Sequence, residues 1–320
     1  MPTIPVLDHD AVLAAVTPAA AIDHVREALL RHHAGAWTMP PKVYLDCPDG
    51  DFRAMPARGE GFALLKWITS FPGNPAGGLP TVMGIVCLSD SSNGMPLMLL
   101  EAGSVTALRT GAVAAVAARA LARPDANRAG IIGCGLNGGY VARCMVAAGY
   151  GTGVCFDART GAAERLAAEL GPGWRAGSRA AALAGEIVSC ITPGAGVVVG
   201  TADLHPGLHL NMLGADAAGK AEATVDAVAA CELFCDEWEQ ASHGGELTGA
   251  VNAGIVTRER VTELGAVLSG TAGGRPPGAA GEQAITLFDS TGLAIQDLAI
   301  AQAAFGAWRE GHVEAQSIRL

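Results

Sequence analysis

The stretch GIIGCGLNGGYVARCMVAAGYGTGVCFD, residues 130–157, is the strongest indication of the fold. A short β-rich run at 129–132 leads into the glycine triplet GCGLNG at 133–138, and a helix-compatible stretch continues to Gly149. A second strand, expected at 153–156, is followed by an aspartate. Strand, glycine turn, helix, strand and terminal acid come in the order that a dinucleotide-binding unit requires.

Each glycine of the triplet has a physical role in such a unit. Gly133 allows the tight turn, Gly135 leaves room for a pyrophosphate against the backbone, and Gly138 lets helix and strand approach closely. The phosphates would lie at the helix N-terminus, where free N–H groups and the helix dipole favour anions. A glycine-rich turn in some other α/β protein is the alternative interpretation.

The acid at the end of the second strand indicates the choice of cofactor. Asp157 can accept hydrogen bonds from both hydroxyls of an adenosine ribose, and its charge would repel a 2′-phosphate. NAD is therefore favoured over NADP. Arg159 and Thr160 follow closely, and these two side chains could in principle tolerate a phosphate.

Size and composition exclude several classes of protein. A chain of 320 residues can form two ordinary domains, and 50% hydrophobic against 16% charged residues indicates a compact fold rather than a disordered one. The net charge of −10, without any Lys/Arg run, argues against nucleic-acid binding. No apolar window has the length and flanks of a membrane span, and the acidic start does not resemble a signal peptide.

The eight cysteines are scattered and form no Cys-x-x-Cys motif. No His/Cys set has zinc spacing either, so we expect no metal site. Free thiols of this kind are typical of a reducing compartment, which predicts a cytoplasmic protein.

Periodicity and turn signals predict the remaining elements. They are a helix over 8–34, a largely antiparallel sheet over 42–102, a helix over 104–122, strands at 186–191, 207–213 and 231–235, a loop at 270–281, and a last helix at about 291–310. The fold class is therefore α/β, with a doubly wound Rossmann sheet over 113–287. Residues 1–112 and 288–320 form a second α+β domain, because the last helix is expected to pack back on the N-terminal part.

Four cations of the N-terminal region are candidates for chemistry. Lys66 lies in the apolar strand ALLKWI, where loss of hydration favours the neutral amine and suits a proton donor and acceptor. A lysine that faces the surface of the strand is the equal alternative. Lys42, Arg53 and Arg109 could together bind a carboxylate, although each alone also fits a surface cation.

Two acidic segments follow apolar strands of the nucleotide domain. Asp216 lies in NMLGADAAGKAE, where a carboxylate could activate water or orient an amine, or could simply cap a helix. In that second interpretation Lys220 is its helical surface partner. Asp289-Ser290-Thr291-Gly292 either caps the last helix or contacts the nicotinamide.

The chain resembles the ornithine cyclodeaminase/mu-crystallin family over nearly its whole length. The matching stretches, in family order, are MPPKVYL (39–45), FRAMPA (52–57), LLKWITSFPGNPAGGLPTVMG (64–84), NGMPLMLLEA (93–102), VTALRTGAVAA (105–115), IIGCGLNGG (131–139), LGADAAGKAE (213–222) and DSTGLAIQD (289–297). The resemblance implies a Rossmann domain plus a substrate-binding and dimerisation domain built from both chain ends. It also implies a nicotinamide cofactor, a homodimer, and amino acids or cyclic imines as substrates.

The resemblance also implies roles for single positions. Lys42, Lys66 and Arg109 match positions that bind the substrate carboxylate or supply an acid/base, and Asp216 matches the catalytic aspartate of the cyclodeaminases. Arg53 departs from those enzymes, which have an acid near this point, and looks more like the alanine-dehydrogenase branch. The predicted cofactor-binding residues are Thr110, Gly133, Gly135, Leu136, Asn137, Gly138, Asp157, Arg159, Thr192 and Ser290.

These observations predict an NAD-dependent oxidoreductase that interconverts an amino acid and its imino or oxo acid. Lys66 and Asp216 are its predicted catalytic residues, and Lys42, Arg53 and Arg109 its predicted substrate-binding residues. One alternative is an amino-acid cyclodeaminase, a lyase with an internal NAD redox cycle. The other is a crystallin-like protein that binds a small molecule in a nicotinamide-dependent way.

Overall fold

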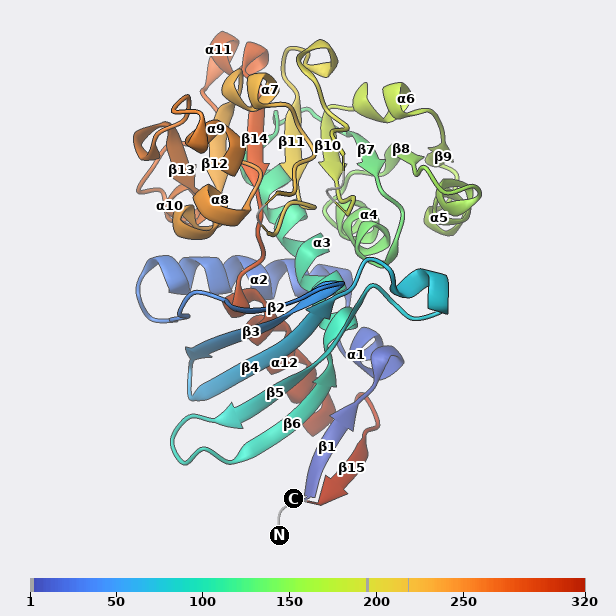
Figure 1. The fold of residues 1–320 in the computed structure, drawn as a ribbon, viewed down its shortest axis with the longest axis vertical. Coiled ribbons are helices and arrows are strands. Elements are labelled where there is room, and N and C mark those ends of the chain that lie inside the picture. Colours follow the sequence, from blue (N-terminus) through green and yellow to red (C-terminus); the bar gives the residue numbers. More distant parts are fainter. Residues whose placement is uncertain (1–2, 194–195, 218, 320) are drawn as a thin grey trace. The chain divides into compact units, whose positions relative to one another are not determined.

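The computed structural model describes residues 3–193, 196–217 and 219–319, and the chain separates into two compact units (Figure 1). Unit 1 comprises Met1–Arg109 and Leu293–Leu320, and unit 2 comprises Thr110–Gly292. The sequence places the joints at 112/113 and 287/288, a few residues from these boundaries. Unit 1 thus combines both ends of the chain.

The described part of unit 1 contains a seven-stranded sheet of order β15-β1-β6-β5-β4-β3-β2. Its strands are β1 (Thr3–Leu7), β2 (Val43–Cys47), β3 (Gly50–Gly59), β4 (Phe62–Ser70), β5 (Val82–Asp90), β6 (Pro96–Glu101) and β15 (Gln316–Arg319). Its helices are α1 (His9–Ala15), α2 (Pro18–His33), α12 (Ala294–Arg309) and the start of α3 (Ala102–Leu121). Neighbouring strands are antiparallel except β1 and β6, which run parallel.

Helix α12 contacts β3, β4 and β5 and packs against α2 (Figure 1). Because side chains alternate along a strand, this cover buries every second residue of β4, including Lys66 and Ile68. Leu65 and Trp67 point to the other face and stay exposed. One face of the sheet is therefore a core and the other is apolar but open.

Two predictions for unit 1 were incomplete. The helix expected over 8–34 is two helices, because Val16 is extended and the Thr17 hydroxyl caps α2 by accepting a hydrogen bond from the Ala20 N–H. Strands β1 and β15 were not predicted, although they pair along Thr3–Val6 and Gln316–Arg319.

Unit 2 contains, in its described residues, an eight-stranded sheet of order β13-β12-β14-β11-β10-β7-β8-β9, in which every pair is parallel. Its strands are β7 (Arg128–Ile132), β8 (Thr152–Phe156), β9 (Trp174–Ala176), β10 (Ile187–Cys190), β11 (His209–Met212), β12 (Glu232–Cys235), β13 (Val261–Glu263) and β14 (Thr286–Asp289). Its helices, besides the rest of α3, are α4 (Leu136–Ala147), α5 (Ala162–Leu170), α6 (Arg179–Leu183), α7 (Val225–Ala229), α8 (Trp238–Gly244), α9 (Thr248–Asn252), α10 (Leu264–Ser269) and α11 (Gly278–Gln283).

The strand order of unit 2 runs outward from β7 in both directions, with β8 and β9 on one side and β10 and β11 on the other. This reversal is the topological switch of a Rossmann sheet, so the predicted fold class is confirmed. The loop expected at 270–281 is partly wrong, because α11 starts at Gly278.

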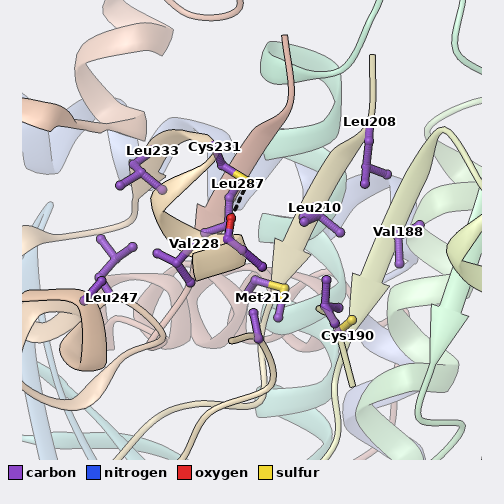
Figure 2. Packing of buried hydrophobic residues seen from close by; sticks show 14 of the residues in the cluster. Val188, Cys190, Leu208, Leu210, Met212, Val228, Cys231, Leu233, Leu247 and Leu287 are labelled. Atoms are coloured by element: carbon purple, nitrogen blue, oxygen red, sulfur yellow. Dashed lines mark hydrogen bonds between the residues drawn. The ribbon is translucent and has the colours of Figure 1, made fainter. Parts of the chain in front are cut away.

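The core of unit 2 lies between this sheet and its helices (Figure 2). Its buried side chains include Val188, Cys190, Leu208, Leu210, Met212, Val228, Leu233, Leu247 and Leu287. Cys231 also belongs to it, and its thiol donates to the Ala227 carbonyl at 3.2 Å. All eight cysteines are free thiols. No helix of the described residues is long and apolar enough to cross a membrane.

Candidate active site

Lys66 is the buried centre of a charged cluster in unit 1. Only 1% of the residue is exposed, so the alternative of a surface lysine is wrong. Its Nζ donates to Asp297 Oδ1 at 2.7 Å and to Thr106 Oγ1 at 3.2 Å. Burial lowers the pKa of the Lys66 ammonium from 10.5 to about 8, against the opposing charge of Asp297. This amine can therefore change its charge close to neutral pH.

Arg109 and Lys42 carry further positive charge beside Lys66. Arg109 Nε lies 3.7 Å from Asp297 Oδ1 and forms no hydrogen bond to any described residue, although it is buried. The charges of Arg109 and Lys42 both add to the lowering of the pKa of Lys66. Two predicted cations, Lys66 and Arg109, thus lie against one buried carboxylate, and the charge of Lys42 also acts on Lys66.

Arg53 lies on the same face of the sheet as Lys66. On β3, Met55 pairs with Lys66 and Arg53 pairs with Ile68, so alternation turns Arg53 towards the covered face. Arg53 Nε donates to Asp51 Oδ1 at 2.5 Å, Nη2 donates to Asp51 Oδ2 at 3.1 Å, and the guanidinium lies 5.4 Å from the Tyr44 ring centre. These contacts hold the guanidinium in a fixed orientation.

The glycine loop of unit 2 connects β7 to α4. Gly133 has a φ of 100°, which side-chain-bearing residues rarely adopt. A Cβ at Gly138 would overlap the Gly133 carbonyl oxygen, so the close approach of helix and turn depends on its absence. No side chain of a described residue caps the N-terminus of α4, so side chains leave its first N–H groups available to an anion.

Asp157 directly follows β8 and is held by local contacts. Its Oδ2 accepts from the Cys134 N–H at 2.7 Å, and its oxygens also accept from the backbone and the guanidinium of Arg159. Burial opposes ionisation, but the hydrogen bonds from Arg159 and Cys134 lower the pKa of Asp157 to about 2. The carboxylate is therefore charged at any physiological pH.

Thr110 begins unit 2 inside helix α3. Its Oγ1 is buried and finds no hydrogen-bond partner among the residues that the structure describes. A buried hydroxyl without a partner is costly, and a ligand oxygen would satisfy it. Together with the glycine loop and the charged Asp157, this residue fits a dinucleotide.

Three more predicted residues follow adjacent strands of the unit 2 sheet. Thr192 follows β10, Asp216 follows β11 and Ser290 follows β14, so all three lie at the carboxyl edge, where α/β sheets bind ligands. Glu222 links two of these strand ends, because it accepts from Thr192 N, Thr192 Oγ1 and Gly214 N, each at 2.7 Å.

Both helix-capping alternatives are wrong. No helix follows Asp216 among the described residues before α7, and Lys220 donates to Asp216 Oδ1 at 2.6 Å across a loop. The N-cap of α12 is Leu293, and the Ser290 hydroxyl instead donates to Asp236 Oδ2 at 3.1 Å. Strand β14 continues through Asp289, and the residues that follow it do not cap α12. Asp236 binds them instead, since its Oδ2 also accepts a hydrogen bond from the Gly292 N–H.

Asp297 and Thr106 also belong to the unit 1 cluster, although no sequence pattern predicted a role for either. Asp297 lies in AIQDLAIAQAAF, and an aspartate inside so apolar a helix is a signal that a buried cation must pair with it. The described residues contain no cluster of His, Cys, Asp and Glu that could bind a metal ion.

Fold and site together define a two-unit protein with a Rossmann unit and a second α+β unit that buries a charged cluster around Lys66. The model of the ornithine cyclodeaminase/mu-crystallin family matches residues 6–312, and the chain belongs to this family. It is 37% identical over 311 residues to the alanine dehydrogenase of Archaeoglobus fulgidus, covering 94% of each chain.

Two solved structures resemble the whole chain. An archaeal alanine dehydrogenase dimer with bound NAD superposes with a TM-score of 0.93 at 35% identity, and 100% of both chains is covered. The Delta(1)-pyrroline-2-carboxylate reductase of Thermococcus litoralis, in complex with NADH and L-proline, has a TM-score of 0.92 at 25% identity. It covers 99% of this chain and 100% of its own.

Proposed function

We propose that the chain is an NAD-dependent oxidoreductase that interconverts an amino acid and its imino or oxo acid by hydride transfer. The observation that carries this proposal is Lys66, a buried amine with a pKa of about 8 among further cations. A group with a pKa near the working pH is suited to general acid–base catalysis. The relatives named above, a dehydrogenase and an imine reductase, support the same reaction class.

Lys42, Arg53 and Arg109 bind the α-carboxylate of the substrate in this proposal. Guanidinium groups grip a carboxylate through two parallel hydrogen bonds, and the orphaned Nε of Arg109 is available for one. Asp51 is already paired with Arg53 and therefore offers no free carboxylate to a second ammonium group. The proposed substrates therefore carry a neutral or anionic side chain rather than the amine of ornithine or lysine.

Thr110, the 133–138 loop, Asp157, Arg159, Thr192 and Ser290 hold the cofactor. NAD, when bound, supplies the hydride acceptor for oxidation or, as NADH, the hydride donor for reduction. Asp157 selects NAD over NADP, because its charge repels a 2′-phosphate.

Lys66 moves the protons. In the oxidative direction its neutral amine takes a proton from the substrate ammonium, so that the nitrogen lone pair forms the C=N bond as the α-hydrogen leaves with its electron pair. Asp216 orients the water that adds to this imine, and loss of ammonia then gives the oxo acid. In the reductive direction the Lys66 ammonium returns the proton to nitrogen.

A substrate panel followed by absorbance at the NADH band tests the proposal. Alanine, arginine, ornithine and lysine are offered with NAD, and keto acids with ammonia or cyclic imines with NADH. We expect NADH to accumulate, or to be consumed, with one class of substrate. Release of ammonia from a diamino acid without lasting NADH would support a cyclodeaminase instead. Uptake of NADH without any turnover would support a binding protein.

We also infer that the open face of the unit 1 sheet pairs with a second copy of the chain. Strand register places Val43, Leu45, Leu65, Trp67 and Ile85 on this one face, and all five are exposed. A contiguous apolar patch on a sheet is typical of an interface. The similar alanine dehydrogenase was solved as a dimer.

Sedimentation measurements test the dimer. We expect wild-type protein at twice the monomer mass and Trp67→Glu protein as a monomer, because a buried unpaired charge is costly. Ile255→Glu is the matched control, since Ile255 is an exposed apolar residue of unit 2. A wild-type monomer at micromolar concentration would contradict the inference.

A further inference from the structure

The two acceptors of Lys66 come from distant parts of the chain. Asp297 lies in α12, 231 residues after Lys66, and Thr106 lies in α3, 40 residues after it. No sequence pattern predicted a role for either residue, and neither takes part in the reaction proposed above. Their geometry around the amine is nevertheless specific.

Both neighbours can only accept a hydrogen bond from Lys66. Thr106 Oγ1 donates its single proton to the Ala102 carbonyl at 2.7 Å, so towards Lys66 it offers lone pairs alone. An ionised Asp297 has no proton to give. Two of the tetrahedral positions around Nζ are therefore fixed as N–H bonds in both protonation states of the amine.

One tetrahedral position of Nζ then remains for exchange. In the ammonium form this position carries the third N–H. In the neutral amine, whose two N–H groups still donate to Asp297 and Thr106, it carries the lone pair. We propose that Asp297 and Thr106 are positioning residues that fix the direction in which Lys66 gives and takes its proton. The proposal rests on the proposed function of Lys66 as the acid and base.

The contacts of Asp297 argue against a purely structural role. Its Oδ2 is buried and has no hydrogen-bond partner among the described residues, so half of the carboxylate is left unsatisfied. A residue kept only to stabilise α12 would be better apolar, because an incompletely paired buried charge is costly. Its negative charge also faces Lys66 against the opposing charges of Arg109 and Lys42.

The two residues differ in charge, so their effects can be separated. Asp297→Asn keeps an acceptor of the same shape but removes the charge that favours the ammonium. Thr106→Val keeps the shape but removes the acceptor, and Thr106→Ser restores it. The first change should alter the pKa of Lys66, and the second should alter the direction of proton transfer.

Lysine NMR measures the first effect without any substrate. The chain has three lysines, Lys42, Lys66 and Lys220, so 13Cε-labelled lysine gives three signals, which Lys42→Arg and Lys220→Arg assign. We expect Asp297→Asn to lower the titration midpoint of Lys66 by roughly 1 to 3 pH units, the usual effect of losing an opposite charge at contact distance. The midpoint of Lys220 serves as the internal reference and should stay unchanged.

Kinetics measure the second effect. In the oxidative direction the pH limb of kcat should move to lower pH in Asp297→Asn, together with the Lys66 midpoint. Thr106→Val should lower kcat by about tenfold to hundredfold, less than the roughly 10²- to 10⁴-fold contribution of the acid and base itself, while KM and the pH limb stay unchanged. Thr106→Ser should recover most of kcat.

An unchanged Lys66 midpoint and pH profile in folded Asp297→Asn protein would overturn the proposal. Wild-type kcat in Thr106→Val would do the same, and this variant decides the matter if Asp297→Asn does not fold. Failure of the proposed function looks different: wild-type protein then turns over no amino or imino acid with NAD(H), while the NMR midpoints still show whether Asp297 controls the Lys66 proton.

Discussion

The glycine loop of unit 2 and the charged cluster of unit 1 are built in opposite ways. The loop uses backbone from six consecutive residues, 133–138, and its acid, Asp157, is paired with Arg159 two residues on. The cluster uses side chains from β4, α3 and α12, and its central pair joins residues 231 positions apart. The glycine loop depends on the absence of side chains, whereas the charged cluster depends on buried charged side chains.

The two regions therefore respond to substitution through different energies, steric in the loop and electrostatic in the cluster. In the loop, close approach is a steric condition, so a single added carbon decides whether backbone or ligand fits. In the cluster, burial shifts the pKa of Lys66 while its neighbours shift it up or down, so the response to change is electrostatic and depends on pH. Substitutions in the loop should therefore impair folding or cofactor binding, whereas substitutions in the cluster should change the pH dependence of Lys66.

The largest effect is expected for Lys66→Met. Removing the general acid and base should lower kcat by about 10²- to 10⁴-fold, while NAD(H) affinity measured by calorimetry stays at the wild-type value. The control is Arg58→Met, an exposed cation on the neighbouring strand β3. Turnover at the wild-type rate in Lys66→Met would remove the lysine from the chemistry.

Alanine at two glycines of the loop tests the steric side of the comparison. A Cβ at Gly135 would meet only the Arg159 Nη2, at 3.6 Å, so Gly135→Ala should fold with an unchanged Tm and yet bind NAD at least tenfold more weakly. Gly138→Ala should instead lower Tm, because its Cβ overlaps backbone. Equal NAD affinity in wild-type and Gly135→Ala protein would place the pyrophosphate elsewhere.

Glu246 tests whether the buried charges of unit 2 behave like those of unit 1. Burial raises the pKa of Glu246 from 4.5 to about 7, although backbone N–H groups of Glu222 and Ala223 oppose this. A raised folded-state pKa means that the stabilisation is present below pH 4.5 and is lost as pH rises through 7. Urea unfolding between these pH values should show wild type losing on the order of 2 kcal/mol relative to Glu246→Gln. Parallel pH profiles of the two proteins would contradict this expectation.

The smallest effect is expected for Asp157→Ser. Loss of the carboxylate removes repulsion of a 2′-phosphate and releases Arg159, so the ratio of NADP to NAD affinity should rise about tenfold, which corresponds to about 1.4 kcal/mol. Calorimetric Kd values for both cofactors measure the ratio. An unchanged ratio would show that the ribose binds at another residue.

Local patterns predicted much of unit 2 and less of unit 1. Strands β7 and β8, with helix α4 between them, lie within a residue or two of their predicted ends, because glycine turn, periodicity and acid are all written in one short stretch. Strands β1 and β15 escaped prediction because each is short and gains its stability from pairing across the whole length of the chain. The split between α1 and α2 depended on a single Thr-Pro step inside a continuous apolar period.

From local patterns, the sequence predicted the Rossmann unit, the glycine loop, the acid that follows β8 and a set of cations for binding a carboxylate. It left the state of Lys66 undecided, because alternation along a strand defines two faces without saying which one is covered. In the folded chain, α12 packs over β3, β4 and β5, which buries Lys66 and supplies Asp297 as its partner. Backbone geometry is encoded over a few residues, whereas the solvation of a side chain depends on what folds against it.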